Sequence, residues 1–157
     1  MVKETGERRV RRSSEFDGLL DDLVGKDKPF DTIRDAQLFA GCLGFSRDCK
    51  LQLGKKQAEP IRWDVMSNRP GTETAVNLIA VLTNEGDPEI LSDERFDERM
   101  RIFEEYAGGG FSIIRDLVDS STSPAREVLQ KLVHDLIPRA SDRKTADIRG
   151  AVDVMFG

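Results

Sequence analysis

The most informative part of the sequence is residues 29–45, PFDTIRDAQLFAGCLGF. Thr32 followed three residues later by Asp35 imitates a capping box, which marks the start of a helix, and we expect the helix to end near Gly44. The small residues on one face of this helix would let another backbone approach closely: Ala36, Ala40, Gly41 and Gly44. The stretch therefore predicts a helix that packs tightly against a second segment.

Apolar residues recur at helical spacing along most of the remaining chain. We expect further helices over residues 13–25, 60–67, 72–83, 93–107, 124–136 and 141–156. Residues 46–59 between them read as an exposed connection with at most a short strand at Leu51 and Leu53. The periodicity predicts an all-α fold, a compact helical domain of about six to seven helices.

Three consecutive glycines, residues 108–110, follow the longest of these helices. Each glycine costs about 1 kcal/mol relative to alanine in a helix interior, so we expect a break before the helix resumes at Phe111. The run could form a nest that binds an anion, but a hinge or a tight helix crossing is the commoner reason for such glycines.

Length and composition bound the class of protein. A chain of 157 residues suits one cored domain, and its 38% apolar and 34% charged residues are typical of a helical protein with a solvated surface. No apolar run approaches the roughly 20 residues that span a membrane, and the N-terminus lacks the apolar core of a secretory signal. We therefore expect a cytoplasmic protein with a flexible basic arm over residues 1–12 and a single domain over residues 13–157.

The net charge of −5 hides two basic segments, residues 1–12 and 47–62, in an otherwise acidic chain. Clustered guanidinium and ammonium groups can follow a phosphate backbone, whereas the bland alternative for the first segment is a solubilising terminus. Trp63 could stack on an unpaired base but is more often a core residue in such a helix. The candidate nucleic-acid contacts are Arg8, Arg9, Arg11, Arg12, Arg47, Lys50, Lys55, Lys56 and Arg62.

Residues that would carry catalysis or bind a metal are few. A structural zinc site needs four cysteine or histidine ligands, and the chain has only Cys42, Cys49 and His134. The pair Gly54–Lys55 lacks the remaining residues of a phosphate-binding loop. The sequence thus predicts no catalytic residues, no metal and no cofactor.

Three blocks of sequence carry a family resemblance: PFDTIRDAQLFAGCLGF, EPIRWDVM and GDPEILSDERFDERMRIFEEYAGGGFSII. In these blocks the chain resembles the bacterial Dnd system-associated protein 4 family, which is encoded alongside DNA phosphorothioation genes. The likeness covers roughly residues 8–118 and rests on the order of the blocks, not on an active-site motif. Residues 120–157 contain no block that matches.

The resemblance implies a setting: bacterial systems that replace a nonbridging phosphate oxygen with sulfur and restrict DNA that lacks the mark. It implies no reaction, so our first hypothesis is a non-enzymatic accessory protein of such a phage-defence system. Its partners would be other proteins of the system, with weak DNA contacts, no membrane, and a homo-oligomer left open. A small helical DNA-binding regulator is the alternative, which the acidic total disfavours; an enzyme is a third hypothesis, disfavoured because no convergent acid, base or metal set is found.

Overall fold

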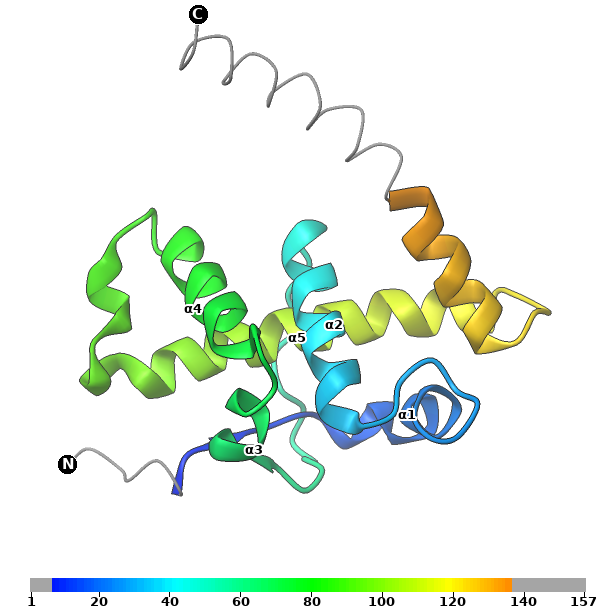
Figure 1. Ribbon diagram of the computed structural model, residues 1–157, viewed down its shortest axis with the longest axis horizontal. Coiled ribbons are helices and arrows are strands. Elements are labelled where there is room, and N and C mark those ends of the chain that lie inside the picture. Colours follow the sequence, from blue (N-terminus) through cyan, green and yellow to red (C-terminus); the bar gives the residue numbers. More distant parts are fainter. Residues whose placement is uncertain (1–6, 137–157) are drawn as a thin grey trace, which may run out of the picture.

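The computed structural model describes residues 7–136 and is mostly helical, as predicted (Figure 1). The α-helices are α1 (Asp17–Leu23), α2 (Ile33–Ser46), α3 (Trp63–Ser67), α4 (Thr72–Thr83) and α5 (Phe96–Asp119), followed by a helical segment over residues 125–136. Short 3-10 turns are η2 (Ser14–Phe16), η3 (Pro88–Leu91) and η4 (Asp93–Arg95). The named strands are β1 (Arg9–Val10) and β2 (Ile61–Arg62).

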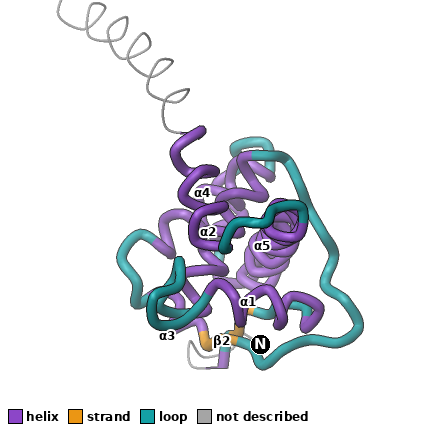
Figure 2. The backbone as a smooth tube through the Cα atoms, turned by 90° about the vertical axis from the view of Figure 1, so that its right-hand side faces the viewer, coloured by secondary structure: helices purple, strands orange, loops and turns teal. Residues whose placement is uncertain are grey.

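Helix α5 is the axis of the molecule, and α2 crosses it near its middle (Figure 1). Helix α4 lies on one side of this crossing, while α1, α3 and β2 lie on the other side (Figure 2). The start of α2 is capped as predicted, because the Thr32 hydroxyl accepts a hydrogen bond from the Asp35 amide at 3.3 Å.

The core consists of two apolar clusters, one around the first half of α5 and one around its second half. The first includes Trp63, which is 6% exposed and packs edge-on against Phe96 with ring centroids 5.4 Å apart. The second includes Phe16 and Phe111, whose ring centroids are also 5.4 Å apart. Helix α5 supplies residues to both clusters, so its apolar stripe joins the two halves of the core. The expectation that Trp63 is a core residue is confirmed.

The predicted break at residues 108–110 is wrong, because α5 runs through all three glycines without interruption. The reason is the close approach of α2. A Cβ added to Gly110 would lie 1.8 Å from the Ala40 carbonyl oxygen, and one added to Gly44 would lie 1.9 Å from the Tyr106 carbonyl oxygen. The contacts between the α2 and α5 backbones, which only glycine allows, offset the low helix propensity of glycine. The small face predicted for α2 is therefore the crossing surface.

Three further expectations from the sequence need correction or lie outside the described residues. Residues 9–12 do not form a mobile arm, since residues 9 and 10 pair with β2 and Val10 is fully buried. The helix expected from Pro60 begins only at Trp63, because Ile61 and Arg62 pair with β1. Residues 1–6 and the helix expected over 141–156 lie outside the described part of the chain.

Candidate functional site

The two basic segments of the sequence pair with each other. Strands β1 and β2 are antiparallel, with Arg9 opposite Arg62 and Val10 opposite Ile61. The pairing continues beyond the strands through a Ser13–Gln57 bridge, and the Ser14 amide donates to the Lys56 carbonyl at 3.0 Å. We call residues 8–14 together with residues 54–62 the basic ribbon.

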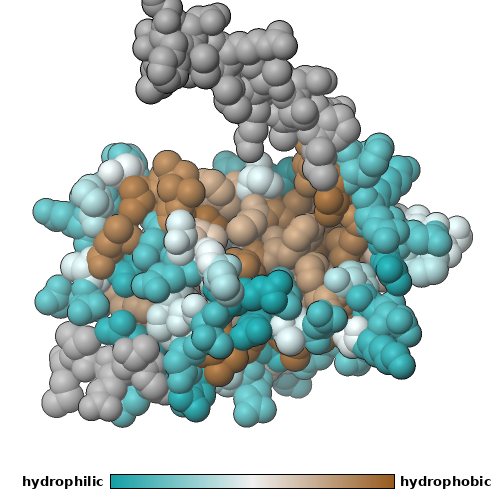
Figure 3. Space-filling model, viewed as in Figure 1, coloured by the Kyte–Doolittle hydropathy of each residue, from teal (hydrophilic) through white to brown (hydrophobic). Residues whose placement is uncertain are grey.

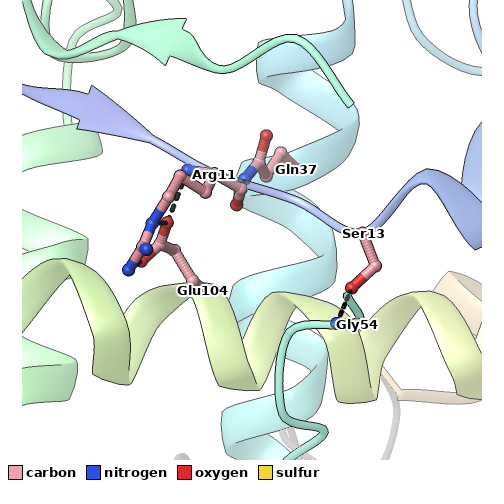
Figure 4. A network of polar contacts seen from close by, with 5 residues as sticks. All are labelled: Arg11, Ser13, Gln37, Gly54 and Glu104. Atoms are coloured by element: carbon pink, nitrogen blue, oxygen red, sulfur yellow. Dashed lines mark hydrogen bonds and ion pairs between the residues drawn. The ribbon is translucent and has the colours of Figure 1, made fainter. Parts of the chain in front are cut away.

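Polar contacts to α5 and α2, and one between its own two segments, hold the basic ribbon in place (Figure 4). The Glu104 carboxylate of α5 accepts hydrogen bonds from the Arg11 amide at 2.5 Å and from the Arg11 guanidinium at 3.0 and 3.1 Å. Gln37 of α2 donates from Nε2 to the Arg11 carbonyl at 3.0 Å. The Ser13 hydroxyl accepts from the Gly54 amide at 2.7 Å. The contacts of Arg11, together with the buried Val10, fix one face of the ribbon on the helices.

The ion pair between Arg11 and Glu104 joins a half-exposed cation to a fully buried carboxylate. Burial raises the pKa of Glu104 above its ordinary value, and the hydrogen bonds from Arg11 oppose that rise. The side-chain hydrogen bonds to Glu104 raise the pKa of Arg11. A buried carboxylate is costly without its partner, so Arg11 stabilises the fold at this position.

Three of the nine predicted DNA contacts are engaged inside the fold. Besides Arg11, these are Arg8, whose guanidinium lies 4.1 Å from the centroid of the Phe96 ring, and Arg12, which is 9% exposed. Arg12 donates to the Glu59 carbonyl at 2.8 Å, and burial lowers its pKa. The side chains of Arg8 and Arg12 are therefore largely unavailable to a phosphate backbone.

The other predicted contacts are exposed and fall into two groups. On the basic ribbon, Arg9 and Arg62 are opposite each other in register, which places their side chains on one face, and Lys55 and Lys56 follow along the same ribbon. Arg62 also pairs with Asp64. Arg47 and Lys50 lie apart from the ribbon, directly after α2, where the Lys50 ammonium lies 4.9 Å from the centroid of the Tyr106 ring.

Sequence reasoning missed the residues that anchor the basic ribbon: Ser13, Gln37 and Glu104. Glu104 looked like one more surface carboxylate of a charged helix. A signal for the strand was present, because Val10 stands between arginines in the alternating pattern of a half-buried strand. Nothing in the sequence pointed to the pairing between segments about 50 positions apart in the chain.

Residues that could bind a metal do not gather in the described part of the chain. Across residues 7–136, no group of three or more His, Cys, Asp or Glu side chains could hold a metal ion. His134 is exposed and lies 3.9 Å from the neighbouring Asp135 carboxylate. Cys42 and Cys49 are free thiols. None of the helices in this part of the chain is both long and apolar enough to span a membrane.

A comparison with known protein families shows to which family the chain belongs. The profile of the family described as DNA sulphur modification system-associated protein 4 matches residues 9–150. The chain belongs to this family. The match begins at β1 and includes all of the basic ribbon except Arg8, and all of α5. It extends beyond the blocks on which the sequence resemblance rested. Neither the curated proteins nor the solved structures gave a match. Association with a DNA sulphur modification system is thus the functional setting of the protein.

Proposed function

We propose that this protein is a non-enzymatic accessory component of a bacterial DNA phosphorothioation-linked modification and restriction system that acts in phage defence. It works in the cytoplasm through contacts with other proteins of the system and through weak contacts with DNA. The observation that supports this most is the family match over residues 9–150. The match names an association with a system and not a reaction.

The basic ribbon is the surface that we assign to DNA. Its exposed cations are Arg9, Lys55, Lys56 and Arg62. A paired ribbon advances about 3.3 Å per residue, so these side chains are spread over a length that several backbone phosphates would cover. The net charge of −5 repels the rest of the duplex, which keeps this binding weak and dependent on salt. Arg47 and Lys50 would add contacts at the end of α2.

The alternative, a helical DNA-binding regulator, has less support from the helices. A recognition helix enters the major groove with side chains that reach base edges, commonly arginine or lysine. Helix α4, TETAVNLIAVLT, carries neither residue, and the five-residue α3 carries none. The exposed cations among the predicted DNA contacts lie instead on the basic ribbon and after α2, where they suit backbone phosphates better than bases.

Copurification from a host that carries the whole system tests the accessory role. The full chain is tagged at its own locus, and the lysate is treated with nuclease so that DNA cannot bridge two proteins. The proposal expects untagged proteins of the same system in stoichiometric amounts. Recovery of the tagged chain alone, from nuclease-treated and untreated lysates alike, would contradict it.

A further inference from the structure

The outer face of α4 leaves large apolar side chains in solvent. Leu78 and Leu82 are one helical turn apart and are 55% and 53% exposed, although the opposite face of α4 is buried in the core. Leu91, at the end of the neighbouring η3, is 39% exposed. Figure 3 shows apolar side chains over α4, bordered by hydrophilic ones. Helix η3 packs against α4. We call Leu78 and Leu82 of α4, Glu85 just after it, and Glu89 and Leu91 of η3 the acidic leucine patch.

The segment that follows α4 is strongly acidic. Residues 85–99 contain seven carboxylates against two arginines, and one of the seven, Asp93, lies 3.9 Å from the Arg8 guanidinium. Both arginines are committed within the fold: Arg99 is 6% exposed and donates to the carbonyls of Ile90 and Ser92, and Arg95 forms a double hydrogen bond with Glu98 at 2.9 and 3.1 Å. Glu85 and Glu89 are exposed. The border of the patch therefore presents negative charge.

The patch is held in a fixed shape. Glu85 and Gly86 adopt left-handed conformations, with φ of 56° and 81°, which turn the chain sharply after α4. Asp87 then caps η3 by accepting a hydrogen bond from the Glu89 amide at 2.9 Å, and Ile90 of η3 is fully buried. A partner would thus meet a surface that is already ordered, which lowers the entropy lost on binding.

We propose that the acidic leucine patch docks an amphipathic helix of a partner protein, with apolar side chains on one face and lysine or arginine beside them. The leucines at i and i+4 match the spacing of such a helix, and the carboxylates match its cations. The inference rests on the proposed function, in which the protein acts through protein contacts. It adds which surface is used and what chemistry the partner presents.

Other occupants fit this surface less well. Carboxylates repel the phosphates of DNA. A second copy placing its own patch here would bring like charges together. The basic ribbon of a second copy supplies cations, but the large apolar residues exposed in the described part of the chain lie outside it: Val65, Leu78, Leu82, Leu91, Leu117, Val133 and Leu136.

The test uses a fluorescent synthetic helix with leucines on one face and lysines beside them, and its scrambled form of equal composition. Fluorescence anisotropy with the full chain should show at least tenfold tighter binding of the helix than of the scrambled peptide. Leu78→Ser with Leu82→Ser, and separately Glu85→Lys with Glu89→Lys, should each weaken binding at least tenfold. These side chains are exposed, so the fold should survive, which circular dichroism checks.

Two matched controls separate the patch from general charge attraction. Leu117→Ser removes an exposed leucine of α5, and Asp21→Lys with Asp22→Lys reverses two exposed carboxylates of α1. Both should bind the helix as the unchanged protein does. Equal binding of the scrambled peptide, unchanged binding by the Leu78/Leu82 variant, or a dimer in sedimentation that this variant dissociates would overturn the proposal. Copurification of system proteins that persists in such a case would leave the accessory role standing.

Discussion

The α2–α5 crossing and the basic ribbon both attach distant segments to α5, but by opposite physical means. At the crossing, backbones touch because glycines remove the side chains between them, and no charge is involved. At the ribbon, the buried Glu104 carboxylate and the Gln37 amide bind Arg11, while most of the other charged residues of the ribbon are exposed. The crossing is therefore a steric device that supports the fold, while the ribbon is a polar attachment that presents cations to solvent.

The crossing should be the most sensitive part of the molecule. Gly110→Ala would place a Cβ 1.8 Å from the Ala40 carbonyl oxygen, so α2 must move away from α5. We expect the free energy of unfolding to fall by about 3 kcal/mol or more, although alanine is the better helix former. Urea denaturation monitored by circular dichroism measures the change.

Two other glycines provide matched controls for Gly110→Ala. A Cβ on Gly108 would lie 3.0 Å from the Leu51 carbonyl oxygen, and one on Gly18 of α1 would meet nothing within 4 Å. Gly108→Ala should therefore cost less than Gly110→Ala, and Gly18→Ala should be neutral or stabilise by about 0.5 kcal/mol. Equal effects at all three positions would show that the crossing is not limited by steric contact.

The next largest effect is expected at the anchor of the basic ribbon. Arg11→Ala leaves the buried Glu104 carboxylate with only one of its hydrogen bonds from Arg11, the one from the backbone amide. Because the Arg11 side chain is half exposed, we expect a loss of about 2 kcal/mol, below the value for a wholly buried pair. Arg101 is an exposed residue of α5, the helix that carries Glu104. Arg101→Ala should change the free energy of unfolding by no more than about 0.5 kcal/mol.

The cost of Arg11→Ala should depend on pH. Burial already raises the pKa of Glu104, and removing Arg11 removes interactions that lower it, so the pKa rises further in the variant. A carboxyl group whose pKa is raised in the folded state contributes stability at pH values below its pKa in the unfolded state, about 4.3. That contribution is lost as the pH rises through the pKa in the folded state. The variant should thus be most destabilised near neutral pH and recover toward acid pH. In the Glu104→Gln background, Arg11→Ala should show no such recovery.

The smallest effect concerns the loop side of the ribbon. Ser13→Ala removes the hydroxyl that accepts from the Gly54 amide at 2.7 Å, and we expect a cost of about 1 kcal/mol. Ser14→Ala, which removes a longer bond of 3.2 Å to the Lys56 carbonyl at an exposed site, should cost less. Hydrogen exchange should show faster opening of residue 54 in the first variant only. Unchanged exchange there would mean that Ser13 does not hold the loop.

The difference between the two regions also explains what the sequence could predict. Helical periodicity and the small residues of α2 are local patterns, and they predicted the helices and a close-packed face. The continuity of α5 through its glycines was missed because it depends on Ala40, a residue of another helix. Propensity alone favoured a break there, and tertiary contact overrode it.

The sequence predicted which basic residues belong to the candidate site, but not how the fold arranges them. The basic residues were visible as two clusters, but which of them the fold uses depends on residues such as Glu104 and Phe96 on α5. Pairing between residues 9 and 62 is a long-range contact that no local pattern specifies. Sequence therefore favoured Arg9 and Arg12 equally as DNA contacts, whereas the structure leaves Arg9 exposed and buries Arg12.

Fluorescence anisotropy of the full chain with plain and phosphorothioated duplexes, across a salt series, tests the assignment of DNA contact to the basic ribbon. The ribbon variant changes four residues to alanine: Arg9, Lys55, Lys56 and Arg62. The control variant removes four exposed cations elsewhere: Lys26, Arg101, Arg126 and Lys131. Four phosphate contacts give a slope of log affinity on log salt of about −3.6. We expect weak binding with a slope near this value, retained by the control and flattened in the ribbon variant without a change in sequence preference. Tight binding that persists in high salt, or a ribbon variant that binds like the unchanged protein, would contradict the assignment of DNA contact to the basic ribbon.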